Sequence, residues 1–172
     1  MKNVSSLNKT LKILGTIIIL VFLTIVAQAG DWPMFHHDPA RTGYTNEIIP
    51  EDLELLWSYD TGGDWRSSPT VAYRKVFVGN HYKIYCLNAS TGNMIWSYET
   101  GDGVYSSPAV ADGKVFVGSY DNKIYCLDEN TGKLMWSYET GDSVCSSPAV
   151  ANGKVFFGSR SRDSSLTLSF YK

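Results

Sequence analysis

The chain beyond residue 52 alternates short apolar runs with polar turns. Val/Phe-rich or alternating segments lie at residues 106–110, 114–119, 123–127 and 134–139. Runs of this length rich in β-branched and aromatic residues predict strands. The first two are separated by Asp-Gly, one of the strongest hairpin signals, and the last two by a polar loop that closes with Gly. The pattern predicts a four-stranded antiparallel sheet.

The same pattern recurs with a period near 40 residues. The 24-residue stretches that begin at Trp96 and Trp136 are identical at 20 positions, and a looser copy begins at Trp57. Such periods are typical of solenoids and propellers, in which one unit cannot bury its faces alone. Four strands per repeat indicate a propeller blade. We therefore predict an all-β fold, a partial β-propeller of four-stranded antiparallel blades, about two and a half of them.

Proline and tryptophan positions predict the strand order within each blade. The first strands contain Pro69, Pro108 and Pro148, and proline is tolerated only where its missing N–H faces no partner. This places the first strand at the edge that lines the central channel. The repeated tryptophans fall on the fourth, outer strand, and residues 53–59 are expected to form such a strand. Recurrence at the blade period favours a packing role for these rings over a cofactor or sugar platform.

The first 29 residues differ in kind from the rest. An apolar core at residues 13–27 follows three lysines and precedes Ala27-Gln28-Ala29, which is the layout of a secretory signal peptide. The apolar run is short for a spanning helix, although an uncleaved anchor is the alternative. We therefore expect an exported protein (secreted, periplasmic or cell-surface) with a signal helix at 1–29, an extended lead-in at 30–52, repeats at 53–172, and blades at 67–99, 106–139 and, in part, 146–172.

Charge and cysteine usage exclude several classes of function. Cleavage after residue 29 would leave 143 residues and, with three lysines lost, take the net charge from −2 to −5. No basic run is present, so nucleic acid is not an expected partner, and a membrane is expected only through an uncleaved N-terminal segment. Cys86 and Cys126 occupy equivalent repeat positions and are expected to be buried, while Cys145 is expected to be a free thiol.

Two segments, CLNASTGNMIW (residues 86–96) and CLDENTGKLMW (residues 126–136), carry a family resemblance. They resemble the tryptophan docking motif of the pyrroloquinoline-quinone-like β-propeller repeats, and residues 31–45 resemble the lead-in of exported members. The motif aspartate is Asp128 in one copy and Asn88 in the other, and the motif alanine is cysteine in both. The resemblance implies that the motif ties neighbouring blades together and binds no quinone. It assigns blade docking to Trp57, Thr91, Gly92, Trp96, Asp128, Thr131, Gly132 and Trp136.

The resemblance also bears on catalysis. Quinone-dependent dehydrogenases of this superfamily need an aspartate base, calcium ligands and usually a vicinal disulfide, and the chain has no Cys-Cys pair. The repeat-related Asp102, Asp121 and Asp142 are expected to stabilise turns. No catalytic residue is assigned. The leading hypothesis is a non-catalytic module that binds a protein or surface ligand, as in the outer-membrane assembly lipoprotein. The alternative is a dehydrogenase fragment, for which pyrroloquinoline quinone and calcium would be cofactors, and a third is a product without function of its own.

His36-His37-Asp38 is the densest group of metal-ligand residues. In an extended segment adjacent side chains point to opposite sides, so the two histidines would not converge on one ion. No further ligand follows at a matching spacing, and a polar surface segment is the favoured interpretation. His81 falls in a turn and is expected to be solvated.

Two surface features are weaker hypotheses. Asn88-Ala89-Ser90 is a glycosylation sequon on an expected loop. Aromatic residues in turns are candidates for a recognition rim, since aromatic residues are enriched at interfaces. These are Trp65, Tyr73, Tyr82 and Tyr120.

The repeat is lost after Ser159, where the expected Tyr-Asp-Asn-Lys is replaced by Arg-Ser-Arg-Asp. Leu166, Leu168 and Phe170 still alternate and are candidates for a substitute strand. Propellers close with 4–8 blades. We therefore expect a shortened product of a longer propeller, whose open blade faces favour self-association.

Overall fold

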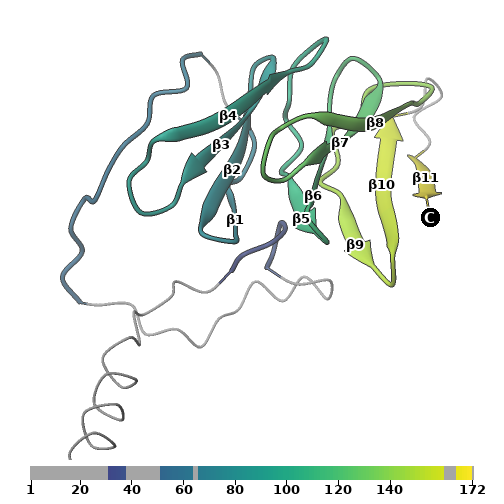
Figure 1. Cartoon of the computed structure of the whole chain (residues 1–172). Coiled ribbons are helices and arrows are strands. Elements are labelled where there is room, and N and C mark those ends of the chain that lie inside the picture. Colours follow the sequence, from purple (N-terminus) through teal and green to yellow (C-terminus); the bar gives the residue numbers. More distant parts are fainter. Residues whose placement is uncertain (1–30, 38–50, 64–65, 161–165, 172) are drawn as a thin grey trace, which may run out of the picture.

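The computed structural model describes residues 31–37, 51–63, 66–160 and 166–171. Within these ranges the chain is all-β and forms three antiparallel sheets that stand side by side in an arc (Figure 1). The predicted fold class is therefore confirmed. The expected signal peptide at 1–29, most of the lead-in, Asp38 and Trp65 lie outside the described residues. In the described part of the chain, no helix is long and apolar enough to span a bilayer.

The first two sheets have four strands each, in chain order from the inner to the outer edge. The first consists of β1 (Thr70–Ala72), β2 (Lys75–Asn80), β3 (Lys83–Asn88) and β4 (Met94–Glu99). The second consists of β5 (Ala109–Ala111), β6 (Lys114–Gly118), β7 (Lys123–Asp128) and β8 (Leu134–Glu139). The third has the order β11-β10-β9 and consists of β9 (Ala149–Ala151), β10 (Lys154–Arg160) and β11 (Leu166–Tyr171). The substitute strand after Ser159 is thus confirmed as β11.

Hairpin turns between the first and second strands form as predicted. Asp112 and Gly113 have φ of 51° and 71°, and Asn152 and Gly153 repeat these angles one period later. Positive φ at both central residues is the geometry that matches the right-handed twist of the flanking strands.

Inner strands lie at a sheet edge, as the prolines predicted, but they are shorter than expected. Each proline immediately precedes its strand, so the strand of the second blade begins at Ala109 and not at Ser106. The preceding serines bond through their side chains instead: Ser106 Oγ accepts from Gly118 N at 3.1 Å within the blade. Ser107 Oγ accepts from Ser68 N at 2.9 Å in the blade before. These serines therefore join neighbouring blades at the inner edge.

Residues 53–59 form no strand, and this prediction was wrong. A strand needs a hydrogen-bonded neighbour, and none of the described strands pairs with this segment. Its leucines, Leu53, Leu55 and Leu56, are 79–84% exposed. The segment therefore has the composition of an outer strand without a sheet.

Buried side chains from adjacent blades pack together between the sheets. One cluster joins Phe77 and Trp96 of the first blade to Val115 and Leu127 of the second. All three cysteines are free thiols, and Cys145 is exposed. Burial raises the pKa of Cys86 to about 12 and that of Cys126 to about 11. The two buried thiols therefore serve as small apolar residues.

The lead-in crosses the inner edges of two blades. Trp32 forms a β-bridge with Val71, and Pro33 O accepts a hydrogen bond from Val110 N at 2.7 Å. The following segment is a turn, because His36 and His37 have φ of 64° and 73°, so the extended backbone expected at these two histidines was wrong. The His37 ring contacts Trp32 edge-on, with centroids 4.6 Å apart. The histidines are thus part of a packed turn.

Candidate docking sites between the blades

Trp57 and Trp96 each contact the loop between the third and fourth strands of the following blade. Trp57 Nε1 donates to Ala89 O at 2.9 Å, and Trp96 Nε1 donates to Glu129 O at 3.0 Å. Each ring lies on the glycine of that loop: a Cβ at Gly92 or Gly132 would lie 2.7 or 2.6 Å from the indole. Both glycines also have a positive φ of about 70°. Only glycine fits this place without strain.

The loop keeps its shape through a side-chain cap. Asp128 Oδ1 accepts from Asn130 N at 3.1 Å, from Thr131 N at 2.8 Å and from Thr131 Oγ1 at 2.7 Å. These hydrogen bonds, first of all that of the Thr131 side chain, lower the pKa of Asp128. In the first blade Asn88 Oδ1 accepts from Ser90 N and Thr91 N in the same way. The aspartate and threonine of the sequence motif therefore shape the loop that receives the tryptophan.

An ion pair that the sequence did not indicate adds to the contact between Trp96 and the loop of the second blade. Lys75 Nζ lies 2.6 Å from Glu129 Oε1 and 2.8 Å from Asn130 Oδ1, so β2 of the first blade reaches the loop of the second. Both side chains are largely buried, at 15% and 6% exposure. The partners are 54 residues apart, and only the placement of successive blades brings them together. A basic residue that recurs at the start of each second strand is the signal in the sequence, and it is too common to identify a partner.

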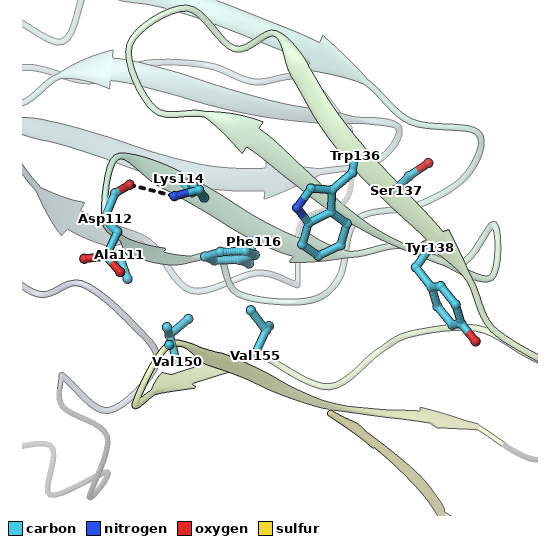
Figure 2. A pocket seen from close by; sticks show the side chains of 10 residues that line it. Ala111, Asp112, Lys114, Phe116, Trp136, Ser137, Tyr138, Val150 and Val155 are labelled. Atoms are coloured by element: carbon cyan, nitrogen blue, oxygen red, sulfur yellow. Dashed lines mark hydrogen bonds between the residues drawn. The ribbon is translucent and has the colours of Figure 1, made fainter. Parts of the chain in front are cut away.

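Trp136, the third predicted docking residue, contacts no such loop among the described residues. Its half-buried ring lies against Phe116 and lines an open pocket of about 550 Å³. Figure 2 shows Lys114 and Phe116 of the second blade on one side of this pocket, and Val150 and Val155 of the third on the other. Among the described residues, Lys114 Nζ donates to Asp112 O alone, at 3.1 Å. The pocket thus presents an indole N–H and an ammonium group.

The remaining carboxylates of the repeat bind backbone groups. Asp102 Oδ1 accepts from Gly103 N at 2.7 Å, and Asp142 Oδ1 accepts from Ser143 N at 2.6 Å. Asp121 accepts from Gly101 N and from the Tyr125 hydroxyl, and burial together with this bond raises the pKa of Tyr125. These contacts agree with the expected turn-stabilising role. No group of three or more potential ligands is gathered in the described part of the chain.

The other predicted surface residues lie in turns between the strands or, in the case of Asn88, at the end of β3. Asn88 of the sequon is half-buried and caps its loop, and His81 is exposed and contacts Tyr82 edge-on. Tyr73 and Tyr82 are exposed, whereas Tyr120 packs edge-on against Tyr105, whose ring also lies 5.3 Å from the Arg66 guanidinium. The structure therefore brings together the docking residues. Of the tyrosines, Tyr73 lies in the β1–β2 turn, whereas Tyr82 and Tyr120 lie in the β2–β3 and β6–β7 turns, whose backbones both bond residues 100–104.

Comparison with known proteins gives one family and one fold. The PQQ_2 family model, described as Outer membrane protein assembly factor BamB, matches residues 81–169, which is more than half of the chain. The quinohemoprotein alcohol dehydrogenase from Comamonas testosteroni is similar, at 28% identity and a TM-score of 0.69 over 78% of this chain and 24% of that one. A europium-containing methanol dehydrogenase is 26% identical, at a TM-score of 0.73 over 85% of this chain and 30% of that one.

The fold of BamB itself is also similar. BamB from Moraxella catarrhalis is 24% identical, at a TM-score of 0.59 over 67% of this chain and 36% of that one. The chain thus spans about a quarter to a third of these proteins. No curated protein matches it significantly.

Proposed function

Because the chain belongs to the family of PQQ-like propeller repeats that includes the outer membrane protein assembly factor BamB, we propose that it is an exported, non-catalytic binding or scaffold module. Its partner in this proposal is a protein or a surface ligand, and its open blade faces associate with one another. The docking tryptophans hold the blades in place and take no part in chemistry.

The observation that carries this proposal is an apolar surface on the outer strands. Met94 and Ile95 of β4 are 51% and 43% exposed, and Leu134 and Met135 of β8 are 45% and 50% exposed. Both strands are sheet edges, with their outer backbone groups unpaired by any described strand. Exposed apolar residues beside an open strand edge favour association with another polypeptide.

The use of the carboxylates supports a structural rather than a chemical role. Asp102, Asp121, Asp128 and Asp142 each accept backbone N–H groups. A carboxylate engaged in this way stabilises a turn. At Asp128 the hydrogen bonds to the charged form also lower its pKa, which makes it a weaker base.

Two lines support export. The N-terminal residues have the layout of a signal peptide. The matching family is described by a factor that acts in outer membrane protein assembly. Export to the periplasm or the cell surface is therefore part of the proposal.

A fragment of a quinone-dependent dehydrogenase is the second candidate, supported by the likeness to the two dehydrogenases at 26–28% identity. A spectroscopic titration of the full chain with pyrroloquinoline quinone, with and without calcium, separates the two. We expect no saturable change in the absorbance of the quinone. Saturable, calcium-dependent binding would contradict the proposed module and favour the dehydrogenase fragment.

A further inference from the structure

The two ends of the arc are incomplete in complementary ways. The first blade is preceded by residues 53–59, an outer-strand sequence that belongs to no sheet, and the third blade ends at β11 without an outer strand among the described residues. These two ends lie on opposite sides of the arc (Figure 1). We propose that residues 53–59 of one copy form the fourth strand of the third blade in a second copy.

The sequence of the segment is that of a fourth strand. Residues 55–59 read Leu-Leu-Trp-Ser-Tyr, and residues 134–138 of β8 read Leu-Met-Trp-Ser-Tyr. The single difference is Leu56 in place of Met135, a swap of two apolar side chains of similar volume. The segment therefore carries the side chains of an outer strand and lacks only its pairing partner.

The segment is already docked on the first blade as β4 is docked on the second. Trp57 Nε1 donates to Ala89 O at 2.9 Å, as Trp96 does to Glu129 O at 3.0 Å. The ring of Tyr59 lies 5.9 Å from that of Tyr85, and the ring of Tyr98 lies 5.7 Å from that of Tyr125. One face of a blade-to-blade contact is thus present in each copy before any partner arrives.

The third blade offers the matching edge. Among the described strands β11 pairs with β10 alone, and Phe156 lies opposite Phe170 as Phe116 lies opposite Cys126. Ser169 therefore holds the place of Tyr125, which pairs with Ser137 of β8. In this register Ser58 of the first copy lies opposite Ser169 of the second copy, and the backbone ladder of the blade is completed.

The same register also brings opposite charges of the two copies together. Between the first and second blades, Asn130 accepts a hydrogen bond from Lys75. When residues 53–59 are aligned with β8, Glu51 occupies the position of Asn130. Glu51 is exposed within its own copy. In the second copy it would enter the pocket beside Trp136 and pair with Lys114, whose ammonium group donates to Asp112 O.

Two copies supply enough blades for a ring. The described part of each copy has three sheets, so two copies that exchange these strands have six, within the range of 4–8 blades at which propellers close. A repeated head-to-tail contact gives a ring where its rotation closes and an open filament where it does not, so we expect a closed dimer. This deepens the self-association in the proposed function, on which it rests, by naming the strand, the register and the number of copies.

Cysteine cross-linking of the full chain tests the register. In a Cys145→Ser background, Ser58→Cys with Ser169→Cys places two thiols opposite each other across the proposed pair. We expect oxidation to yield a covalent product of twice the chain mass on non-reducing gels. The matched control pairs Ser58→Cys with Leu166→Cys, three positions along β11 and roughly 10 Å away. This exceeds the reach of a disulfide, so the control should not cross-link.

Size-exclusion chromatography with light scattering tests the stoichiometry and the charge pairing. We expect a mass of two chains, a dimer dissociation constant raised about two- to fivefold by Lys114→Glu, and recovery when Glu51→Lys is added. Circular dichroism of each variant checks that the sheets persist. Failure of the charge swap to recover association in folded variants would overturn the pairing.

The experiments distinguish a failure of the strand exchange from a failure of self-association as such. A monomer, or equal cross-linking in both cysteine pairs, would overturn the strand exchange. A dimer that forms without the Ser58–Ser169 cross-link would overturn it too, and would leave self-association through another face in place.

Discussion

Equivalent residues of the repeat line the contact between the first and second blades and the contact between the second and third. They differ in whether a loop of the next blade covers them. In the first, Trp96 is 7% exposed and Lys75 is bound to Glu129, because the loop at residues 128–132 covers both. In the second, Trp136 is half-buried and Lys114 has only a backbone carbonyl as partner, because no described loop covers them. The repeated tryptophan and lysine are thus fully engaged only when the next blade supplies its loop.

The difference shows where the stability of such an array lies. In repeat proteins the free energy of folding is a sum of terms for each unit and for each interface between neighbours. Equivalent residues in successive blades therefore contribute differently when their interfaces differ. Substitutions made in pairs, one in each contact, measure this difference directly.

The largest difference is expected for the tryptophans. Trp96→Ala removes a buried ring and its hydrogen bond to Glu129 O, and should lower the free energy of unfolding by about 3–5 kcal/mol. Trp136→Ala should cost about 1–2 kcal/mol, because its ring is only partly removed from water. Urea unfolding at one fixed protein concentration, low enough to keep the chain monomeric, measures both. Equal losses would show that the contact between the second and third blades is closed in solution.

The lysines should give an intermediate difference. Lys75→Met leaves the carboxylate of Glu129 nearly buried without a counter-charge, and should cost about 2–3 kcal/mol. Lys114→Met removes one hydrogen bond to a carbonyl, and should change stability by less than about 0.5 kcal/mol. The same unfolding experiment applies. A small loss for Lys75→Met would mean that the ion pair is open to water.

The smallest effect is expected for the two loop caps and depends on pH. The pKa of Asp128 lies below its ordinary value of 3.8, so its carboxylate adds stability above that pH. This contribution is lost as the pH falls through the lower, folded-state pKa. Asp128→Asn should therefore flatten the acid side of the stability curve below about pH 4, and Asn88→Asp should steepen it. Thermal unfolding between pH 2 and pH 7 checks both; a curve unchanged in either variant contradicts the capping role.

Local patterns predicted most of the fold. The hairpin residues at Asp112 and Asn152 and the alternation in β8 and β11 act through backbone geometry and side-chain period, which the sequence shows directly. Residues 53–59 carried the right side chains, but strand formation also needs a neighbour, and periodicity does not report one. The turn at His36 and His37 had no glycine or proline to announce its positive φ.

Contacts between blades were less accessible to sequence reasoning. The motif pointed to Trp96 and Gly132, but the pairing of Lys75 with Glu129 depends on the rotation of one sheet relative to the next. The pocket at Trp136 depends on the loss of the repeat after Ser159, whose effect on the preceding blade appears only in three dimensions.

Contacts at the inner edge join residues almost one repeat apart. Ser68 N bonds Ser107 Oγ, Ser107 N bonds Ser147 Oγ, and Thr70 Oγ1 bonds Pro108 O, over separations of 39, 40 and 38 residues. No step in this series requires a residue more than one blade ahead, so each contact closes only a short loop of chain. During synthesis, each blade can therefore attach as soon as it emerges, and order grows from the amino-terminal end without waiting for the whole chain.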